Sequence, residues 1–327
     1  MLAFIIRRLI QSIVVMLTVA LISFSLFQFV GDPVNNMLGQ EATVQDRENL
    51  RERLGLNDPI AFQFFRFVGN AAQGEFGISY RMARPVKDVI LERLPATLEL
   101  AIVSGTLALF LGIVLGVYTA LRRNGWLSNT IMTLSLVGVS LPTFVIGILL
   151  IYVFAVELHW LPSFGRGDTI QITENWYTGL LTESGRKSLI LPAITLGLFQ
   201  LTLIMRLVRA EMLEVLRTDY IKFAKARGLS QRSVHFHHAL KNTLLPVITI
   251  TGLQLGSIIA FAIITETVFQ WPGVGLLFIT AIQFVDIPVM SAYLVLIAII
   301  FVVINLIVDM LYFVVDPRLR VEKATGH

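Results

Sequence analysis

The stretch DYIKFAKARGLSQRSVHFHHALKNTLLP, residues Asp219–Pro246, breaks a sequence that is otherwise strongly apolar. It forms the core of a polar insert, Arg206–Lys241, that carries eight Lys and Arg residues against three Asp and Glu residues. Long apolar runs precede and follow this insert. A basic segment between such runs is typical of a docking element on the cytosolic side of a membrane protein.

Two short helices are expected inside the insert. Thr218 or Asp219 can begin the first helix, because either side chain can accept a hydrogen bond from a free backbone N–H. Gly228 supplies the turn into a second helix, which we expect over residues 230–240. Ala224 lies four residues before Gly228 on the same face, so we expect a shallow notch that a partner protein can grip. The alternative is a basic loop that contacts lipid headgroups.

The composition indicates a membrane protein. The chain has 327 residues, of which 55% are hydrophobic, and a mean hydropathy of +0.76. A soluble domain of this size does not bury so much apolar surface. A helix needs about 20 apolar residues to cross the hydrocarbon core. The sequence has six such runs: Leu9–Val30, Thr97–Leu121, Leu127–Val156, Leu189–Met205, Val247–Thr265 and Val289–Val315.

We therefore predict an all-α membrane protein, with six transmembrane helices in a single transmembrane domain, residues 1–327. The third run is overlong and contains Pro142, so we expect a kinked or tilted helix there. An even number of spans places both termini on one side of the membrane.

The distribution of Lys and Arg predicts the orientation, because short cytosolic loops carry an excess of both. The basic residues near the two termini and in the loop 206–246 all fall on one side, which we assign to the cytosol. The loop 31–95 on the other side has eight basic residues and nine acidic ones. Loops longer than about 60 residues cross the membrane largely regardless of charge, so this loop does not contradict the assignment.

Three amphipathic pieces are expected inside the exterior loop 31–95. Thr43-x-x-Asp46 is a capping pattern, and it precedes a charged stretch that ends at Leu54. Apolar periodicity then recurs over residues 60–71 and 86–94. We expect these pieces to lie along the outer membrane surface or over the end of the helix bundle.

Small residues recur at every fourth position in two of the spans. They are Ser104, Ala108, Gly112, Gly116 and Ala120 in the second span, and Gly252, Gly256 and Ala260 in the fifth. This spacing places them on one helix face, and small residues permit helices to approach closely in lipid. We expect the four glycines to pack helices within the chain. A face shared with another subunit, or a pathway wall that must slide, is the alternative.

The sequence lacks the motifs of common enzyme sites. It has no G-x-x-x-x-G-K-[ST] phosphate loop, no H-E-x-x-H, no G-x-S-x-G and no cysteine. The cluster of His235, His237 and His238 has no carboxylate nearby, so we expect no metal site. We see no stripe of basic residues interleaved with aromatic ones of the kind that nucleic acid would need. We expect no catalytic residue, no cofactor held by this chain and no nucleic-acid partner.

Three acidic residues lie inside or at the ends of apolar runs, namely Glu99, Glu266 and Asp309. Ionisable groups at membrane depth are costly, so each is a candidate for function. Each lies near a boundary, where snorkelling or a basic partner lowers the cost. We therefore favour structural pairing, with an outer gate at Glu266 as the alternative. No carboxylate is expected at mid-bilayer, which argues against a proton-driven mechanism.

The insert resembles the coupling loop of permease subunits in binding-protein-dependent ABC importers, through Ala224, Gly228 and Leu245-Pro246. Lys222 and Phe223 stand where the general family motif has Glu and Ala, a variation that also occurs in the peptide branch. More closely, the chain resembles the first permease subunit of the dipeptide, oligopeptide and nickel branch. The motifs are RRL (Arg7–Leu9), GDP (Gly31–Pro33), GEFGIS (Gly74–Ser79), RLPATLEL (Arg93–Leu100), MLEVLRTDYIKFAKARGL (Met212–Leu229), HALKN (His238–Asn242), TETVFQWPGVG (Thr265–Gly275) and DPR (Asp316–Arg318).

This resemblance implies a type I ABC importer permease fold in a bacterial cytoplasmic membrane, with both termini cytosolic. It implies a transport subunit rather than an enzyme, paired with a second homologous permease. Two ATPase subunits or domains would bind ATP and Mg, and an external or periplasmic solute-binding protein would deliver the solute. The residues implied to contact the ATPase are Ala224, Lys225, Ala226, Arg227, Gly228, Leu229 and Ser230. Peptides are the default substrate, with nickel and glutathione as alternatives.

Two other classes of protein would require different features in the sequence. A stand-alone secondary transporter would need ligands for a coupling ion near the midplane of the membrane. An intramembrane enzyme would need a nucleophile and a base that face each other within the spans. The sequence offers no evident candidate for either arrangement.

Overall fold

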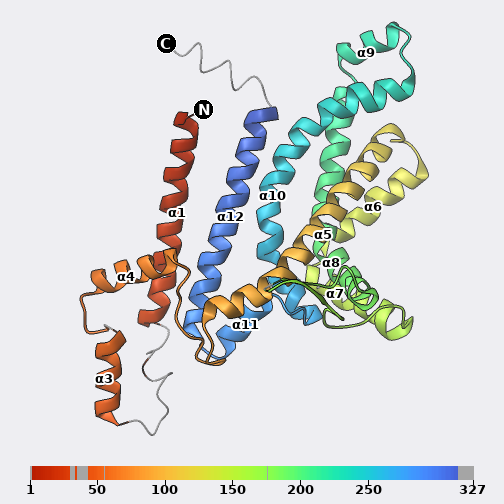
Figure 1. Ribbon diagram of the computed structural model, residues 1–327. Coiled ribbons are helices and arrows are strands. Elements are labelled where there is room, and N and C mark those ends of the chain that lie inside the picture. Colours follow the sequence, from red (N-terminus) through yellow and green to blue (C-terminus); the bar gives the residue numbers. More distant parts are fainter. Residues whose placement is uncertain (1, 30–33, 35–42, 55, 175, 316–327) are drawn as a thin grey trace. The chain divides into compact units, whose positions relative to one another are not determined.

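The computed structural model describes residues 2–29, 34, 43–54, 56–174 and 176–315. Apart from one two-stranded hairpin, its elements are helices, which confirms the predicted all-α class (Figure 1). Two of the motifs named above, Gly31–Pro33 and Asp316–Arg318, lie outside the described residues.

The elements follow one another in a simple order. They are α1 (Leu2–Phe29), α3 (Val44–Leu54), α4 (Ile60–Ala72), α5 (Val86–Leu121), α6 (Trp126–Ser140), α7 (Thr143–Leu150), the π-helix η1 (Ile151–Glu157), β1 (Ile170–Thr173), β2 (Trp176–Thr178), α8 (Glu183–Val215), α9 (Asp219–Ala226), the π-helix η2 (Ser233–Ala239), α10 (Leu240–Phe269), α11 (Val274–Gln283) and α12 (Ile287–Val315).

Four of these helices are long and apolar enough to cross a membrane: α1, α5, α8 and α12. Two bent pairs also qualify when each pair is counted as one span. The first pair is α6 with the α7–η1 segment, and the second consists of two parts of α10 that meet at 48°. Counted in this way the described chain has six spans, in the places that the sequence predicts.

The third span is broken rather than kinked. The axes before and after Pro142 differ by 111°. A proline disfavours the helical conformation in the residue that precedes it, and Leu141 has an extended backbone with φ −95° and ψ 139°. The break therefore lies where the sequence indicates, but a kinked helix was the wrong expectation.

Three other prolines lie inside helices of the described chain. Pro95 lies inside α5, Pro192 inside α8 and Pro246 inside α10. The segment 86–94 is therefore the first part of α5 and not a separate amphipathic helix, which corrects the prediction. Membrane helices tolerate proline because neighbouring groups can satisfy the backbone carbonyl that it leaves free.

The two helices around the polar insert are also longer than predicted. α8 continues past Met205 to Val215, because neither glycine nor proline interrupts it there. The second helix of the insert does not end near residue 240, since η2 leads directly into α10. The first part of the insert is thus a continuation of a span.

The two short helices predicted between the first and second spans are present as α3 and α4. The capping pattern is formed, because Thr43 N donates to Asp46 Oδ2 at 3.1 Å and Asp46 N donates to Thr43 Oγ1 at 3.2 Å. The hydrogen bonds from Thr43 hold the pKa of Asp46 below its usual value. The start of α3 is therefore fixed by local hydrogen bonds.

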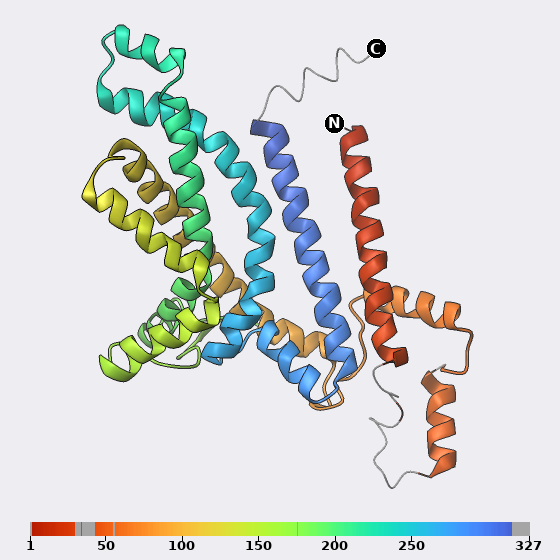
Figure 2. The ribbon, with the colours of Figure 1, turned by 180° about the vertical axis from the view of Figure 1, so that it is seen from behind.

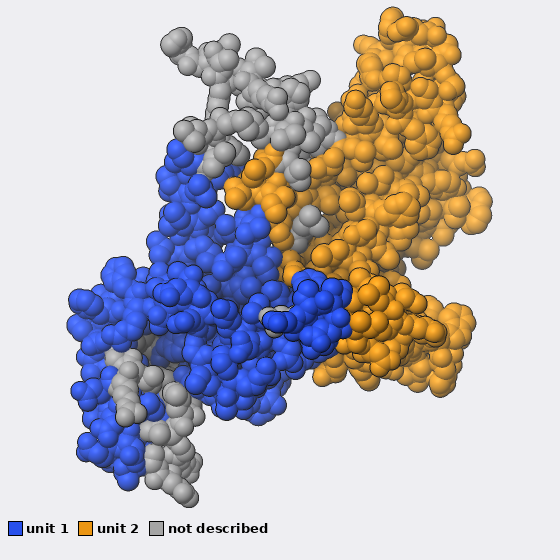
Figure 3. All heavy atoms as spheres, viewed as in Figure 1, with its two compact units in different colours: residues 1–97, 171–177, 272–303 blue, residues 98–170, 178–271, 304–327 orange. Residues whose placement is uncertain are grey.

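The chain folds into two compact units (Figure 3). Unit 1 contains Met1–Thr97, Gln171–Tyr177 and Pro272–Val303, and unit 2 contains the rest. Within unit 2, α8 packs against α10, α7 and α6. Its apolar core joins α5, α8, α9, η2 and the start of α10 through Ala108, Val117, Ala120, Ile204, Val208, Met212, Ile221, Ala224, Val234, Ala239 and Val247.

Three of the glycines named for helix packing contact side chains of this same chain. A Cβ added to Gly112 would lie 2.8 Å from Ile204 Cγ2. At Gly116 the nearest atoms would be Val208 Cβ at 2.7 Å and the carbonyl oxygen of Met205 at 2.8 Å. Gly252 meets Val308 in the same way, and Gly256 is buried. α5 and α8 can approach this closely only because these positions have no side chain.

A buried ion pair joins a loop to α5 within unit 2. Arg166 donates to Glu99, and both side chains are less than one-tenth exposed. Glu99 Oε1 also accepts from Gly179 N at 3.1 Å and from Thr178 Oγ1 at 3.3 Å. The residue before Arg166 is tied to α10, since Gly165 N donates to the carbonyl of Phe269 at 2.9 Å. We call residues 158–169 the Arg166 loop. Glu99 thus has the basic partner that its burial demands.

We expect Glu99→Gln to destabilise the protein by about 3–5 kcal/mol, because it leaves the buried guanidinium of Arg166 without a counter-charge. Thermal unfolding in detergent measures the change. The matched control is Glu183→Gln, since the Glu183–Lys187 pair is more than half exposed and should contribute little to stability. Equal effects of the two substitutions would show that the buried pair has no special role in stability.

Candidate functional site

The polar insert forms a helical hairpin, residues 216–239, which we call the α9 hairpin. It lies beyond the ends of α8 and α10 that it connects (Figures 1 and 2). α9 begins after Thr218, where the sequence predicts a helix start, although the Thr218 side chain makes no capping hydrogen bond, and it ends at Ala226. The return segment is the π-helix η2. Such wide helical turns are rare and are often found at functional sites.

Four buried residues attach this hairpin to the spans. Ile221 and Ala224 of α9 meet Val234 and Ala239 of η2, and all four belong to the same apolar core as Met212 of α8. Thr243 Oγ1 also lies 3.5 Å from Met212 Sδ. The hairpin is therefore packed onto the end of α8 as a folded element.

The burial of Ala224 corrects one prediction. Ala224 is only 5% exposed and faces the chain's own core, whereas Gly228 is exposed. The two small residues therefore do not form a notch on the surface. Spacing along the sequence placed them on one face of a helix, but α9 ends at Ala226, before Gly228 is reached.

Gly228 forms the turn that the sequence predicts. Its φ is +76°, in the left-handed region that favours glycine. Gly228 N donates to the carbonyl of Lys225 at 2.9 Å, which closes the end of α9. A Cβ added here would meet no atom within 4 Å. Within this chain, position 228 thus requires glycine because of its backbone conformation, and a larger side chain would meet no steric obstacle.

The outward surface of the hairpin combines aromatic and basic side chains. Tyr220 and Phe223 are 47% and 65% exposed, whereas Ile221 and Ala224 of the same helix are buried. The exposed cations around them are Lys222, Lys225 and Arg227, and Arg227 lies 5.9 Å from the Phe223 ring. Ala226, Leu229 and Ser230 are also exposed.

Sequence reasoning missed Tyr220 and Phe223 as surface residues. The signal was available, because three-residue spacing places them on one face of a helix. The pattern was ambiguous because α9 has apolar residues on both faces, and only packing shows which face turns inward.

The histidines of η2 face different surroundings. His238 Nδ1 is 2.7 Å from the hydroxyl of Tyr220, which links η2 to α9. Partial burial, and to a smaller extent the charge of Lys225, hold the pKa of His235 below its usual value. Among the described residues, no group of three His, Cys, Asp or Glu side chains could hold a metal ion.

Glu266 is fully buried near the end of α10, and its backbone carbonyl accepts from Trp271 N at 2.9 Å. Trp271 is also fully buried, and the guanidinium of Arg166 lies 5.8 Å from its ring. Asp309 is half-buried in α12. Because α10 runs from Leu240 to Phe269, Glu266 lies near its C-terminal end, whereas the α9 hairpin precedes its N-terminal end.

Two family models match the chain. The model for the inner membrane component of binding-protein-dependent transport systems matches residues 112–321, and the model for the N-terminal part of such components matches residues 1–101.

Curated relatives match along nearly their whole length. The chain is 40% identical to the dipeptide transport system permease protein DppB of Alkalihalophilus pseudofirmus, over 98% of this chain and 100% of the relative. It is 41% identical to the di/tripeptide transport system permease protein DppB of Pseudomonas aeruginosa, over 99% and 100%. It is 37% identical to the glutathione transport system permease protein GsiC of Escherichia coli K12, over 98% and 99%.

A solved structure has the same fold. A chain of the MetNI methionine ABC transporter, in an inward-facing conformation, superposes with a TM-score of 0.54 and 19% identity, over 70% of this chain and 96% of that one. This likeness and the helical spans support the type I permease fold. From the family models and full-length relatives, we conclude that the chain belongs to the inner membrane components of binding-protein-dependent transport systems, as an ABC permease subunit of the dipeptide and oligopeptide type.

Proposed function

We propose that this permease forms one half of a translocation pathway that imports peptides or a related small solute across a bacterial cytoplasmic membrane. Full-length relatives named for dipeptides, di/tripeptides and glutathione support this substrate class. The second half is a homologous permease, and a solute-binding protein delivers the substrate from outside. Two ATPase subunits or domains bind ATP and Mg on the cytosolic side, because this sequence has no phosphate loop.

The observation that carries the mechanism is the α9 hairpin. An ATPase can transmit movement to the membrane helices only through an element that is rigidly attached to them. The hairpin is attached in this way, because buried residues of α9 and η2 pack it on α8. Its proposed contact surface consists of Tyr220, Lys222, Phe223, Lys225, Ala226, Arg227, Gly228, Leu229 and Ser230, all of which are exposed. Aromatic and basic residues are enriched at protein interfaces, with Arg and Tyr prominent among the energetically important ones.

A basic loop on lipid headgroups is the competing interpretation of this hairpin. A lipid surface would attract the cations of the hairpin, and loss of one aromatic side chain would then leave association with the ATPase unchanged. A protein cleft would depend strongly on Phe223, the most exposed aromatic residue of α9. The experiments below separate the two interpretations.

The first test concerns orientation. We place the hairpin and both termini in the cytosol, and the chain has no native cysteine to interfere with labelling. Single cysteines at Ser163 and Gln171 should react with an impermeant thiol reagent in intact cells, whereas Ser230→Cys should react only after lysis. Mass-shift labelling measures both. Reaction of Ser230→Cys in intact cells would overturn the orientation and the cytosolic docking role.

The second test concerns coupling. Phe223→Ala should reduce substrate uptake by about tenfold or more, because it removes an exposed aromatic anchor worth about 2 kcal/mol or more. The permease should still accumulate in the membrane, since this side chain supports no internal packing. Uptake, membrane abundance and co-purification of the ATPase are measured together.

The matched control is Phe236→Ala, an aromatic of similar exposure on η2. It should leave uptake and ATPase association near the wild-type level. Normal uptake by the Phe223 variant, at normal abundance, would exclude α9 as the ATPase contact and would favour the lipid interpretation.

The third test concerns the opposite end of α10. We propose that Glu266 helps to close the outer gate, because it is a fully buried carboxylate at the end of a bent span. Glu266→Gln keeps the shape and removes the charge, so uptake should fall several-fold or ATPase activity should depend less on the binding protein. Glu174→Gln alters an exposed carboxylate and should change neither. Wild-type uptake and wild-type stimulation in the Glu266 variant would leave this residue a structural role only.

A further inference from the structure

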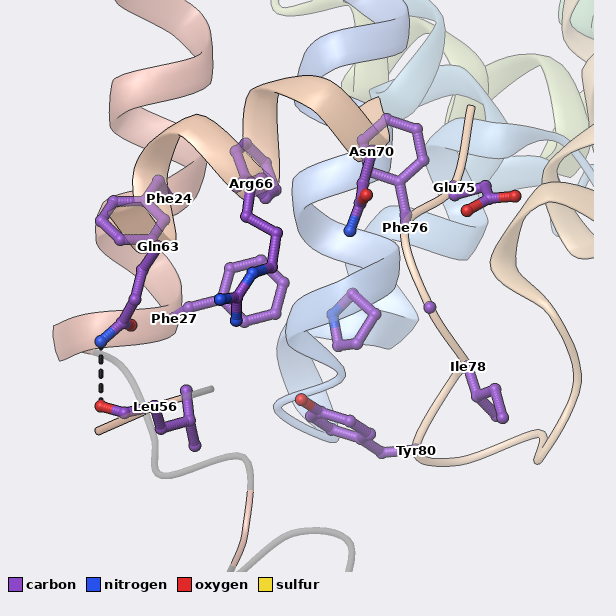
Figure 4. Close-up of a pocket in the computed structure, with 13 residues that line it drawn as sticks. Phe24, Phe27, Leu56, Gln63, Arg66, Asn70, Glu75, Phe76, Ile78 and Tyr80 are labelled. Carbon is purple, nitrogen blue, oxygen red and sulfur yellow. Dashed lines mark hydrogen bonds between the residues drawn. The ribbon is translucent and has the colours of Figure 1, made fainter. Parts of the chain in front are cut away.

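A cavity of about 360 Å³ lies in unit 1, between the end of α1, one side of α4 and the segment 75–80 (Figure 4). Its walls are largely aromatic. They include Phe24, Phe27, Phe67, Phe76 and Tyr80. The lining also includes four polar side chains, namely Gln63, Arg66, Asn70 and Glu75. The cavity is thus apolar with a few polar groups, a composition typical of a site for a small amphipathic molecule.

Ring packing holds the walls in place. Phe67 of α4 lies 6.0 Å from Phe24 and 5.8 Å from Phe27, measured between ring centroids, and 6.5 Å from Phe76. Phe24 also makes an edge contact with Phe64 at 5.6 Å. Such aromatic pairs add to the stability of packed surfaces. The cavity is therefore bounded by fixed rings rather than by loose side chains.

The segment 75–80, which forms the floor of the cavity, is also held in place. Asp286 is buried, and its carboxylate accepts hydrogen bonds from the Ser79 hydroxyl and from Tyr80 N, the latter at 3.2 Å. Val86 N donates to the carbonyl of Gly77 at 3.0 Å. These bonds hold the backbone that carries Phe76, Ile78 and Tyr80. The cavity is thus preformed within unit 1.

The surroundings of the cavity indicate what fills it. Three apolar side chains of α4, namely Ile60, Phe62 and Phe65, are between 65% and 71% exposed. A helix that exposes this much apolar surface is typical of the membrane interface, where the apolar side chains enter the acyl region. α1, which forms the second wall, exposes Leu21 and Ile22 by more than half. Both helices that bound the cavity therefore present apolar surface to lipid.

We propose that this cavity receives an acyl chain of a membrane phospholipid, with the headgroup region beside the polar side chains. Arg66 pairs with Asp58, and Gln63 donates to the carbonyls of Leu56 and Asp58 at 2.9 and 2.8 Å. These contacts hold the polar edge next to the aromatic walls. The site needs only that the chain is a membrane protein and does not depend on the proposed coupling or substrate.

The test uses the assembled transporter in phosphatidylcholine vesicles that contain a phosphatidylcholine with a diazirine on its acyl chain. After illumination, trypsin cleaves after Arg66 and Arg81 and releases residues 67–81. Fragmentation then locates the label within this peptide. We expect label on residues 74–80 in the wild type. The peptide that carries α1 serves as the internal reference for general contact with lipid.

Two variants fill the cavity from different walls, Asn70→Trp from α4 and Ile78→Trp from the floor. Each should lower the label on residues 74–77 several-fold relative to the α1 peptide. Ala61→Trp adds the same ring to α4 at an exposed position outside the cavity, and it should leave the ratio unchanged. Label that persists in both filled variants would overturn the site. Absence of label on 74–80 in the wild type, with α1 labelled, would show that protein atoms fill the cavity and would overturn it equally.

Discussion

The close contact between α5 and α8 supports the rest of unit 2. At Gly112 and Gly116 no side chain separates the two helices, and Ile204 and Val208 fill the space. Lipid offers little hydrophobic force between helices, so their association depends on this close van der Waals packing. The same core continues toward the C-terminal end of α8 and includes the buried residues of α9. The position of the hairpin is therefore a consequence of how two spans pack.

α8 connects two different kinds of interaction. At one end an apolar core attaches the α9 hairpin, and near the other end Gly185 packs against Gly179, whose N–H binds the buried Glu99. At 1.5 Å per residue, its 33 residues extend over about 50 Å. A displacement of the proposed ATPase contact would thus act on one continuous helix. Buried charge at one end and apolar packing at the other fix that helix to neighbouring spans.

Sequence reasoning placed many elements correctly because their signals are local. The capping residues of α3, the apolar face of α4 and the turn at Gly228 all depend on neighbouring residues, and the structure has each of them. Sequence reasoning failed where the structure depends on packing between segments that are distant in the sequence. Pro95 did not end a helix, and Ala224 turned inward because α5, α8 and η2 together form a core that covers it. The partner of Glu99 could not be named, since Arg166 lies 67 residues away in the sequence.

The sequence by itself determined the membrane environment, the number and place of the apolar runs, and the family, because composition, run length and motifs are properties of the chain alone. Only the tertiary structure decided which face of α9 is exposed, where the third span breaks and that four phenylalanines enclose a cavity. These features depend on which segments come together in space. A short helix with apolar residues on two faces does not specify its buried side until another helix packs against it.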